Sequence, residues 1–222
     1  MEREIIRSRR KTLAISVDKS GRLIVRAPLG LSEERIDEFI RSKADWIERH
    51  SEEAAERSLD RSRRLSSPPE ALPLLGEMCR VRHETPPGYI GGCFNLPENT
   101  ALEELLPYLR RLYAAIAKET LIPRTAIIAG RMGITPSAVK INSARTRWGS
   151  CSSQKVINLS WKLIAADPSL IDYVIVHELC HTVHMNHSPA FWAMVEQVIP
   201  DYPERREALK AVQRTLSEYG LE

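Results

Sequence analysis

Hydrophobic and polar residues alternate near the start of the chain. Leu13, Ile15 and Val17 are separated by small or polar residues, and Leu23 and Val25 resume the pattern after a polar break that contains a glycine. Successive side chains of a strand point to opposite faces, so two such segments around a turn predict a β-hairpin.

A helix is expected after the hairpin. Ser32 is a favoured N-cap residue, Glu33 and Glu34 suit a first helical turn, and apolar residues then recur at helical spacing as far as position 47. The stretch 51–69 is rich in Glu, Arg and Ser and ends in two prolines. It should begin as an exposed continuation of the helix and finish as a linker. Short strands are expected between positions 74 and 94.

Helical periodicity returns over positions 101–130. Alternation then predicts strands near 139–141 and at 156–161, with a turn at 148–151 between them. Asp167-Pro168 predicts the start of a helix that runs to about Met185, because an acidic N-cap is followed by proline in the first turn.

Ser188-Pro189 predicts one more helix start by the same device. Strands and helices therefore come in blocks, and the predicted fold class is α+β: a helical catalytic domain with an adjacent β-sheet, preceded by a small N-terminal β-hairpin and helix subdomain. We predict the domain boundary between residues 1–98 and 99–222.

Composition narrows the classes of protein and of site. The 222 residues are 43% hydrophobic and 27% charged, as in ordinary globular proteins, so a sizeable core can form without a metal. A metal site is therefore expected to be catalytic. The net charge of +3 neither demands nor excludes a nucleic-acid partner.

The four cysteines are widely spaced and form no C-x-x-C pair, which argues against a zinc ribbon and against a disulfide scaffold. The N-terminus lacks the apolar core of a signal peptide, and no apolar run is long enough to cross a bilayer. We expect a cytoplasmic protein with no membrane partner and with reduced thiols.

Candidate chemistry is concentrated in His177-Glu178-Leu179-Cys180-His181. His177 and His181 are four residues apart on a predicted helix, so both imidazoles project from one face and can bind one ion at about 2.0–2.1 Å. Glu178 can take a proton from metal-bound water and return it to the leaving group, while zinc lowers the pKa of that water towards roughly 7.

The alternative is a helix with two surface histidines and a salt-bridging glutamate. Two features oppose it. The preceding residues 173–176 are apolar, which indicates a buried helix, and four of the six histidines lie within eleven residues.

Three residues compete for the role of third ligand. His184 lies about 10 Å along the helix from His177, and three ligands in a row cannot easily surround one ion. His187 lies beyond the expected helix end, so it can approach from a turn and leave a fourth position open for water. Glu196 would give a site of two histidines and one glutamate. We favour His187.

Four motifs and two N-terminal segments resemble those of a known family. They are TRWGSC at 146–151, INLSW at 157–161, YVIVHELCH at 173–181, NHSPAFW at 186–192, APLG at 27–30 and KADWI at 43–47. Together they resemble the YgjP-like family of predicted metal-dependent hydrolases, relatives of the SprT-like and WLM zinc peptidases. The resemblance covers nearly the whole chain and is weakest between Ser51 and Ala101.

The resemblance implies a zincin-like catalytic domain in which His177, His181 and His187 bind Zn²⁺ and Glu178 is the general base. It also implies that the strand near Asn158 lies beside the cleft, where zinc peptidases bind an extended substrate through main-chain hydrogen bonds. A nucleotide pyrophosphatase activity has been assigned within the family. Metal-activated water can attack either a carbonyl or a phosphoryl centre.

Arg145, Arg147 and Tyr202 are candidates to stabilise an oxyanion or to bind substrate, with surface charge or packing as the alternative. The leading hypothesis is a zinc peptidase acting on peptides or proteins. The second is hydrolysis of a nucleoside triphosphate, in which Arg145 and Arg147 would have to replace an absent Gly-rich phosphate loop. The third is a nucleic-acid-binding module with structural zinc, which is weakened because no second cysteine lies near Cys180.

Overall fold

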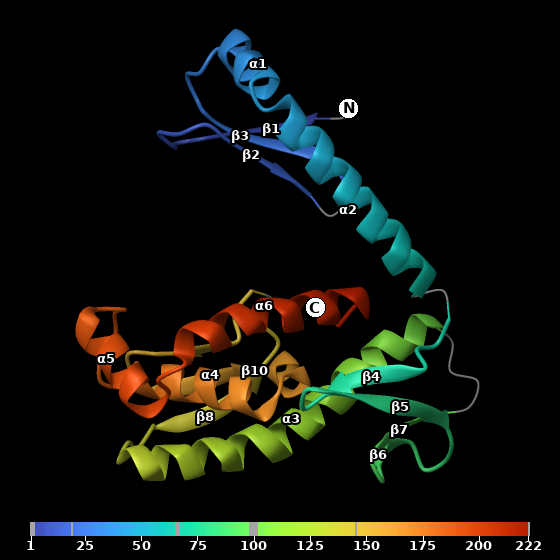
Figure 1. Cartoon of the computed structure of the whole chain (residues 1–222), viewed down its shortest axis with the longest axis vertical. Helices are drawn as coiled ribbons and strands as arrows, with labels where there is room; N and C mark the ends of the chain where they lie inside the picture. The colour runs from blue at the N-terminus through green and yellow to red at the C-terminus, as the bar shows by residue number, and fades with distance from the viewer. Residues whose placement is uncertain (1–2, 19, 65–66, 98–101, 145, 222) are drawn as a thin grey trace. The chain divides into compact units, whose positions relative to one another are not determined.

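The structure is a computed structural model that describes residues 3–18, 20–64, 67–97, 102–144 and 146–221. The chain forms two compact units, Met1–Arg64 and Leu65–Glu222, each of which is described by itself (Figure 1). The division predicted between residues 98 and 99 stays a prediction. By contact, the described residues of 65–98 pack with the second unit, since Leu72, Leu74, Phe94 and Leu96 are buried in its core.

The first unit contains β1 (Arg3–Ser8), β2 (Ala14–Val17), β3 (Leu23–Pro28), α1 (Glu33–Arg41) and α2 (Ala44–Arg64). β2 and β3 pair antiparallel, as the predicted hairpin requires, and β1 adds to β3 in parallel, a strand that the alternation did not indicate. Ser32 caps α1 by accepting a hydrogen bond from the Arg35 amide at 3.5 Å. The structure has two helices where one was expected, because the Ser42 hydroxyl donates to the Phe39 carbonyl and ends α1.

The described part of the second unit combines two small sheets with four α-helices and a 3₁₀ segment. In chain order these are β4 (Ala71–Leu74), β5 (Glu77–His83), β6 (Gly88–Ile90), β7 (Cys93–Leu96), α3 (Leu102–Met132), β8 (Ala138–Asn142), β9 (Gly149–Cys151), β10 (Val156–Ser160), η1 (Trp161–Ala165), α4 (Pro168–Cys180), α5 (Pro189–Val198) and α6 (Tyr202–Glu218). The sheet orders are β4-β5-β7-β6 and β8-β10-β9. The α+β fold class is confirmed.

The segment predicted as a turn at 148–151 is a strand for most of its length. β9 pairs antiparallel with β10, and the reversal lies at residues 152–155, where the Lys155 amide donates to the Ser152 carbonyl at 2.8 Å. β10 is the central strand: it pairs in parallel with β8 on one side and with β9 on the other. β9 is therefore an edge strand of this sheet.

The helix α4 begins as predicted and ends earlier than predicted. Asp167 caps it by accepting a hydrogen bond from the Ser169 amide at 2.7 Å. The helix was expected to reach Met185 but ends at Cys180, because the amide and the hydroxyl of Thr182 both donate to the Leu179 carbonyl and tighten the chain into a turn.

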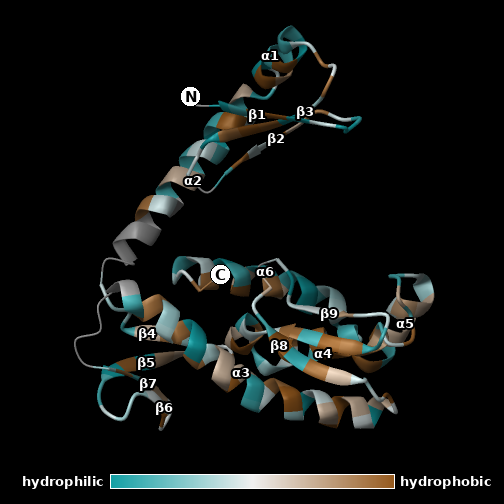
Figure 2. Cartoon of the chain, turned by 180° about the vertical axis from the view of Figure 1, so that it is seen from behind, coloured by the Kyte–Doolittle hydropathy of each residue, from teal (hydrophilic) through white to brown (hydrophobic). Residues whose placement is uncertain are grey.

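α4 is the centre of the second unit. It contacts α3, α5, α6 and the sheet strands β9 and β10, and residues on nearly all faces of the helix are buried. Figure 2 shows hydrophobic residues concentrated on α4 and on the strands beside it. On its outer side, Asp172 accepts two hydrogen bonds from Arg124 of α3, at 2.5 and 2.8 Å, which ties the two helices together. None of the described helices is long and apolar enough to cross a membrane.

Candidate metal centre

Two histidines project from the C-terminal end of α4. His177 is in the last helical turn and His181 is the C-cap residue, whose amide still donates to the His177 carbonyl at 3.3 Å. The backbone is therefore helical across the pair although regular helix ends at Cys180. The two rings lie 4.9 Å apart between centroids, on one side of the helix.

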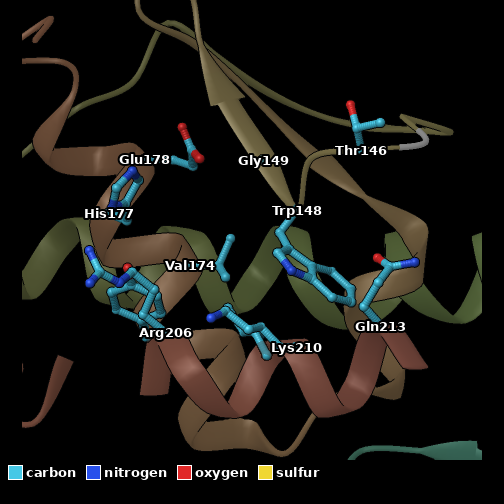
Figure 3. A pocket seen from close by; sticks show the side chains of 11 residues that line it. Thr146, Trp148, Gly149, Val174, His177, Glu178, Arg206, Lys210 and Gln213 are labelled. Atoms are coloured by element: carbon cyan, nitrogen blue, oxygen red, sulfur yellow. The ribbon is translucent and has the colours of Figure 1, made fainter. Parts of the chain in front are cut away.

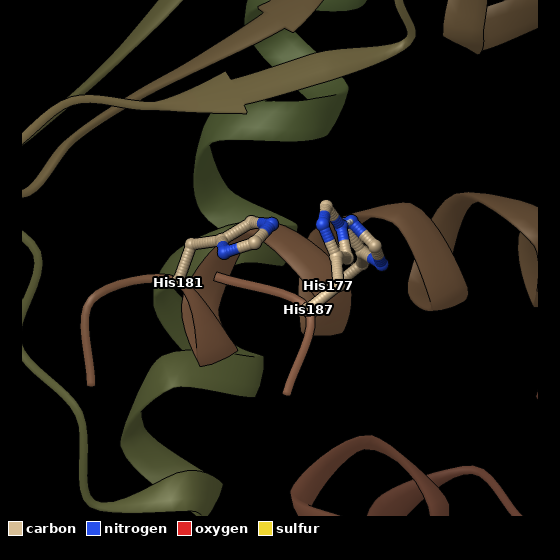
Figure 4. Close-up of side chains that lie close together, drawn as sticks. All are labelled: His177, His181 and His187. Carbon is tan, nitrogen blue, oxygen red and sulfur yellow. Dashed lines mark hydrogen bonds between the residues drawn. The ribbon is translucent and has the colours of Figure 1, made fainter. Parts of the chain in front are cut away.

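His187 reaches the pair from the turn that follows α4. Its Nε2 lies 3.2 Å from the Nε2 of His177, and one ring nitrogen from each of the three histidines lies within 4.8 Å of the others (Figure 4). The next residue, Ser188, fixes the end of this turn. Its hydroxyl caps α5 by accepting a hydrogen bond from the Phe191 amide at 3.4 Å. A turn between two helices thus delivers the third imidazole.

The other two residues considered as third ligand stay outside this group. Glu196 is exposed on α5. The side chain of His184 does not join the cluster either, but its main-chain carbonyl lies 2.9 Å from Nδ1 of His181. That carbonyl can only accept a hydrogen bond, so Nδ1 of His181 carries the proton and Nε2 is left with a lone pair.

An apolar, aromatic shell surrounds the imidazoles. Phe191 stacks on His181 with centroids 4.4 Å apart, and Trp192 stacks on His187 at 5.5 Å. Burial lowers the pKa of His177 to about 3, helped by the neighbouring imidazoles and by Arg206. Burial also lowers the pKa of His181, against the opposing hydrogen bond to His184. Both rings are therefore neutral at pH 7, the form that binds a metal.

Glu178 lies beside the histidine cluster and is 6% exposed. Burial raises the pKa of its carboxyl to about 8, and the positive charge of Arg147 opposes that rise. The side chain packs on the main chain of β9: a Cβ added to Gly149 would lie 2.6 Å from Cγ and 2.7 Å from Oε1 of Glu178. Only glycine fits against the carboxyl group in this position.

A cleft of about 410 Å³ opens on His177 and Glu178. One wall consists of Trp148 and Gly149, and the opposite wall is α6, with Arg206 and Lys210 (Figure 3). Tyr173 and Val174 of α4 line the cleft between these walls. The site thus combines a histidine cluster, a buried carboxyl group and a cleft that can hold a substrate.

The remaining predicted site residues lie at different distances from this cleft. Arg145 lies outside the described residues. Arg147 is exposed and does not line the cleft, although its charge acts on Glu178. Tyr202 stacks on Trp192 at 5.0 Å and does not line the cleft either. Asn158 is on β10, which is paired on both sides, so its main chain cannot pair with a substrate strand.

The residues present fit a tetrahedral metal ion. Ligand nitrogens at about 2.0–2.1 Å from such an ion lie about 3.3 Å from one another, close to the 3.2 Å between His177 and His187. The Nδ1 atom of His177 is buried without a hydrogen-bond partner among the described residues, so this side of the imidazole is held by packing. Three imidazole nitrogens and no cysteine thiolate form the donor set that is typical of open, catalytic sites.

The arrangement defines a metal-dependent hydrolase, and comparison with known proteins identifies its family. The model of the YgjP-like family, described as a metallopeptidase domain, matches residues 11–212. The chain belongs to this family. No curated protein is significantly similar to the chain.

Among solved structures, the chain is similar to the metallopeptidase zymogen abylysin of Pyrococcus abyssi, at 23% sequence identity and a TM-score of 0.36. That match covers 42% of this chain and 91% of abylysin. The family match alone therefore carries the assignment.

Sequence reasoning missed several residues of the cleft, among them Gly149, Arg206 and Lys210. Gly149 stands in a motif that the sequence analysis quotes, but its role depends on a contact with α4 that no local pattern predicts. Arg206 and Lys210 were missed because the helix after Pro203 was not predicted. Their spacing of four residues in a charged helical segment is the signal that could have revealed them.

Proposed function

We propose that the protein is a zinc-dependent peptidase with His177, His181 and His187 as metal ligands and Glu178 as general base. The observation that carries this proposal is the convergence of three imidazole nitrogens within 4.8 Å of one another beside a buried glutamate in a cleft. The metallopeptidase family of the chain supports it. When bound, zinc supplies Lewis acidity, which lowers the pKa of a water molecule and polarises the scissile carbonyl.

The protein's own residues bind the substrate and move the proton. The free edge of β9 offers main-chain donors and acceptors to an extended peptide, and it passes directly beside Glu178. We therefore assign the role of substrate strand to Gly149–Cys151 instead of the region of Asn158.

Glu178 takes a proton from the attacking water, whose oxygen bonds to the peptide carbonyl carbon. The same carboxyl group then delivers that proton to the leaving nitrogen as the C–N bond breaks. A raised carboxyl pKa favours this double role, because the group must accept and release a proton near neutral pH.

The electrophilic role that was expected of Arg147 or Tyr202 stays a proposal. Tyr173 lines the cleft, which Arg147 and Tyr202 do not, and it lies edge-on to His177 with ring centroids 5.9 Å apart. Its hydroxyl is the donor that we favour for the developing oxyanion.

A second function is favoured by one specific observation. Arg206 and Lys210 line the cleft, and two cations there could face the phosphates of a nucleoside triphosphate. A metal-dependent pyrophosphatase is therefore the alternative. A nucleic-acid-binding role with structural zinc gains no comparable support from the site, whose three-histidine set leaves room for a fourth ligand.

The test is to incubate the zinc-loaded protein with an unstructured protein such as casein and, separately, with nucleoside triphosphates. We expect fragments of casein, and we expect Glu178→Gln to lower the rate by about 100-fold or more while it retains its metal. Release of pyrophosphate without any fragments would contradict the peptidase proposal and favour the alternative.

A further inference from the structure

The wall of the cleft formed by α6 carries positive charge. Arg206 and Lys210 are four residues apart and so lie on the same face of the helix, and both line the cleft with His177 and Glu178. Figure 3 shows their side chains rising from α6, with Gly149 and the carboxyl group of Glu178 on the other side of the cleft. Neither residue belongs to the histidine cluster or contacts it through a described hydrogen bond.

Arg206 is held in position by an aromatic ring. Its guanidinium carbon lies 5.7 Å from the centroid of Trp192, the ring that also stacks on His187. Stacking uses the face of the guanidinium group and leaves the N–H donors at its edge available. No carboxylate of a described residue forms an ion pair with Arg206, whereas its neighbour Arg205 is paired with Asp201 at 2.9 Å.

Lys210 contributes a second, adjustable charge. Its ammonium group lies 2.7 Å from Glu207, and both side chains of this pair are largely exposed. Exposed pairs of this kind are weak, so a carboxylate of a ligand can compete with Glu207. The rest of the cleft is apolar or neutral, and Glu178 is the one acidic residue among those described as lining it.

We propose that Arg206 and Lys210 form a carboxylate-binding subsite, so that the enzyme selects peptides with an acidic side chain or a free C-terminal carboxylate near the scissile bond. This inference rests on the proposed peptidase function for its substrate. A peptide paired with β9 projects alternate side chains away from the strand, and the α6 wall faces that strand across the cleft.

The chemistry of the wall suits a carboxylate better than a triphosphate. Two cations, one of them already shared with Glu207, match a single carboxylate. Trp148, Val174 and Leu209 supply apolar area around the two cations, as a peptide side chain requires. The sequence has no Gly-rich loop whose main-chain amides would bind the remaining phosphate oxygens.

The first arm of the test measures cleavage. A glutamate-rich unstructured decapeptide is compared with its glutamine counterpart, each with a free or an amidated C-terminus, using zinc-loaded wild type and the double variant Arg206→Gln/Lys210→Gln. We expect wild type to cleave the glutamate peptide about tenfold faster than the amidated glutamine peptide, and the double variant to cleave these two peptides at similar rates. Arg214→Gln, an exposed arginine of α6 that does not line the cleft, is the matched control and should keep the preference.

The second arm measures binding of the same peptides to the zinc-loaded Glu178→Gln protein by calorimetry. We expect the glutamate peptide to bind about tenfold more tightly than the amidated glutamine peptide, and we expect Arg206→Gln/Lys210→Gln to abolish this difference. This result supports the subsite even if wild type cleaves no peptide. In that case only the peptidase proposal fails. Comparison of the free with the amidated peptides then shows whether the recognised carboxylate belongs to a side chain or to the C-terminus.

Two results would overturn the inference. Cleavage or binding with no preference for the carboxylate peptide would leave the peptidase proposal standing and remove the subsite. Absence of peptide binding, together with triphosphate binding that depends on Arg206 and Lys210, would show that the wall recognises phosphate instead.

Discussion

Glu178 of α4 and Gly149 of β9 are in contact across the boundary between helix and sheet. A Cβ at position 149 would lie 2.6 Å from Cγ of Glu178, which is closer than real Cβ atoms approach their neighbours. The strand that we assign to the substrate is thus also the surface that positions the proposed base. In the proposed mechanism, β9 thereby fixes the substrate and the carboxyl group of Glu178 relative to each other.

The first prediction concerns Gly149→Ala. The added methyl group displaces the Glu178 carboxyl group, so we expect kcat on an unstructured protein to fall on the order of 100-fold while zinc content is unchanged. The free energy of unfolding should fall by about 1–3 kcal/mol, because the methyl group overfills a packed contact. Gly130→Ala is the control: a Cβ there has no neighbour within 4 Å, so activity should be unaffected. Full activity in Gly149→Ala would contradict the proposed position of the base.

The second prediction concerns His184. The main-chain carbonyl of His184 pairs with Nδ1 of His181, and its amide donates a hydrogen bond to the Cys180 carbonyl. Any residue other than proline keeps both of these main-chain hydrogen bonds. We expect His184→Ala to bind zinc with an affinity within about threefold of wild type, measured by competition with a chelator. Substantial loss of zinc in this variant would mean that the His184 imidazole is itself a ligand.

The third prediction uses pH and the metal-free protein. Burial raises the pKa of the Glu178 carboxyl from 4.5 to about 8, so the folded protein binds this proton more tightly than the unfolded chain does. Stability must then fall as the pH rises through this window. Replacement by glutamine removes the cost of the buried charge, so Glu178→Gln should gain stability over wild type by roughly 2–4 kcal/mol between pH 4.5 and pH 8.

Urea unfolding of the two metal-free proteins at several pH values measures this difference. The lowered pKa of His177 has the opposite sign, since its contribution is lost as the pH falls from 6.5 towards about 3. His177 is present in both proteins, so its contribution cancels in the comparison. Parallel stability curves for wild type and Glu178→Gln would contradict the buried, uncompensated state of the carboxyl group.

The elements that the sequence predicted well are those with local signals. Asp167 and Ser188 cap their helices through side-chain hydrogen bonds to the Ser169 and Phe191 amides, as an N-cap followed by proline indicates. The hairpin of β2 and β3 followed from alternation alone. In each case the physical cause lies within a few residues of the element, where a pattern can record it.

The elements that were missed depend on pairing with another strand or on competition between hydrogen bonds, neither of which leaves a periodic pattern. β1 is a strand because it pairs with β3, some twenty residues away along the chain, and β9 is only three residues long and is defined by its partner β10. The early end of α4 depends on the Thr182 hydroxyl, which competes with the backbone for the Leu179 carbonyl. Propensity and periodicity do not weigh such a competition.

In the candidate site, too, the residues fixed by local signals were predictable and those brought together by distant segments were not. The spacing of His177 and His181 and the turn before Ser188 made the histidine cluster predictable, because a helix and a cap fix those three side chains locally. The α6 wall and the contact of Gly149 with Glu178 were not predictable, since each joins segments separated by some thirty residues or more. Asn158 was associated with the cleft through its motif, but the sheet order places β9 at the edge.

The most direct test of the central claim is the zinc content of wild type, His187→Ala and Glu178→Gln after purification with zinc, measured by elemental analysis. We predict close to one zinc per chain in wild type and in Glu178→Gln, because Glu178 is the proposed base and not a ligand, and a large loss in His187→Ala. Full zinc in His187→Ala, or a wild type that binds none, would contradict the three-histidine metal centre.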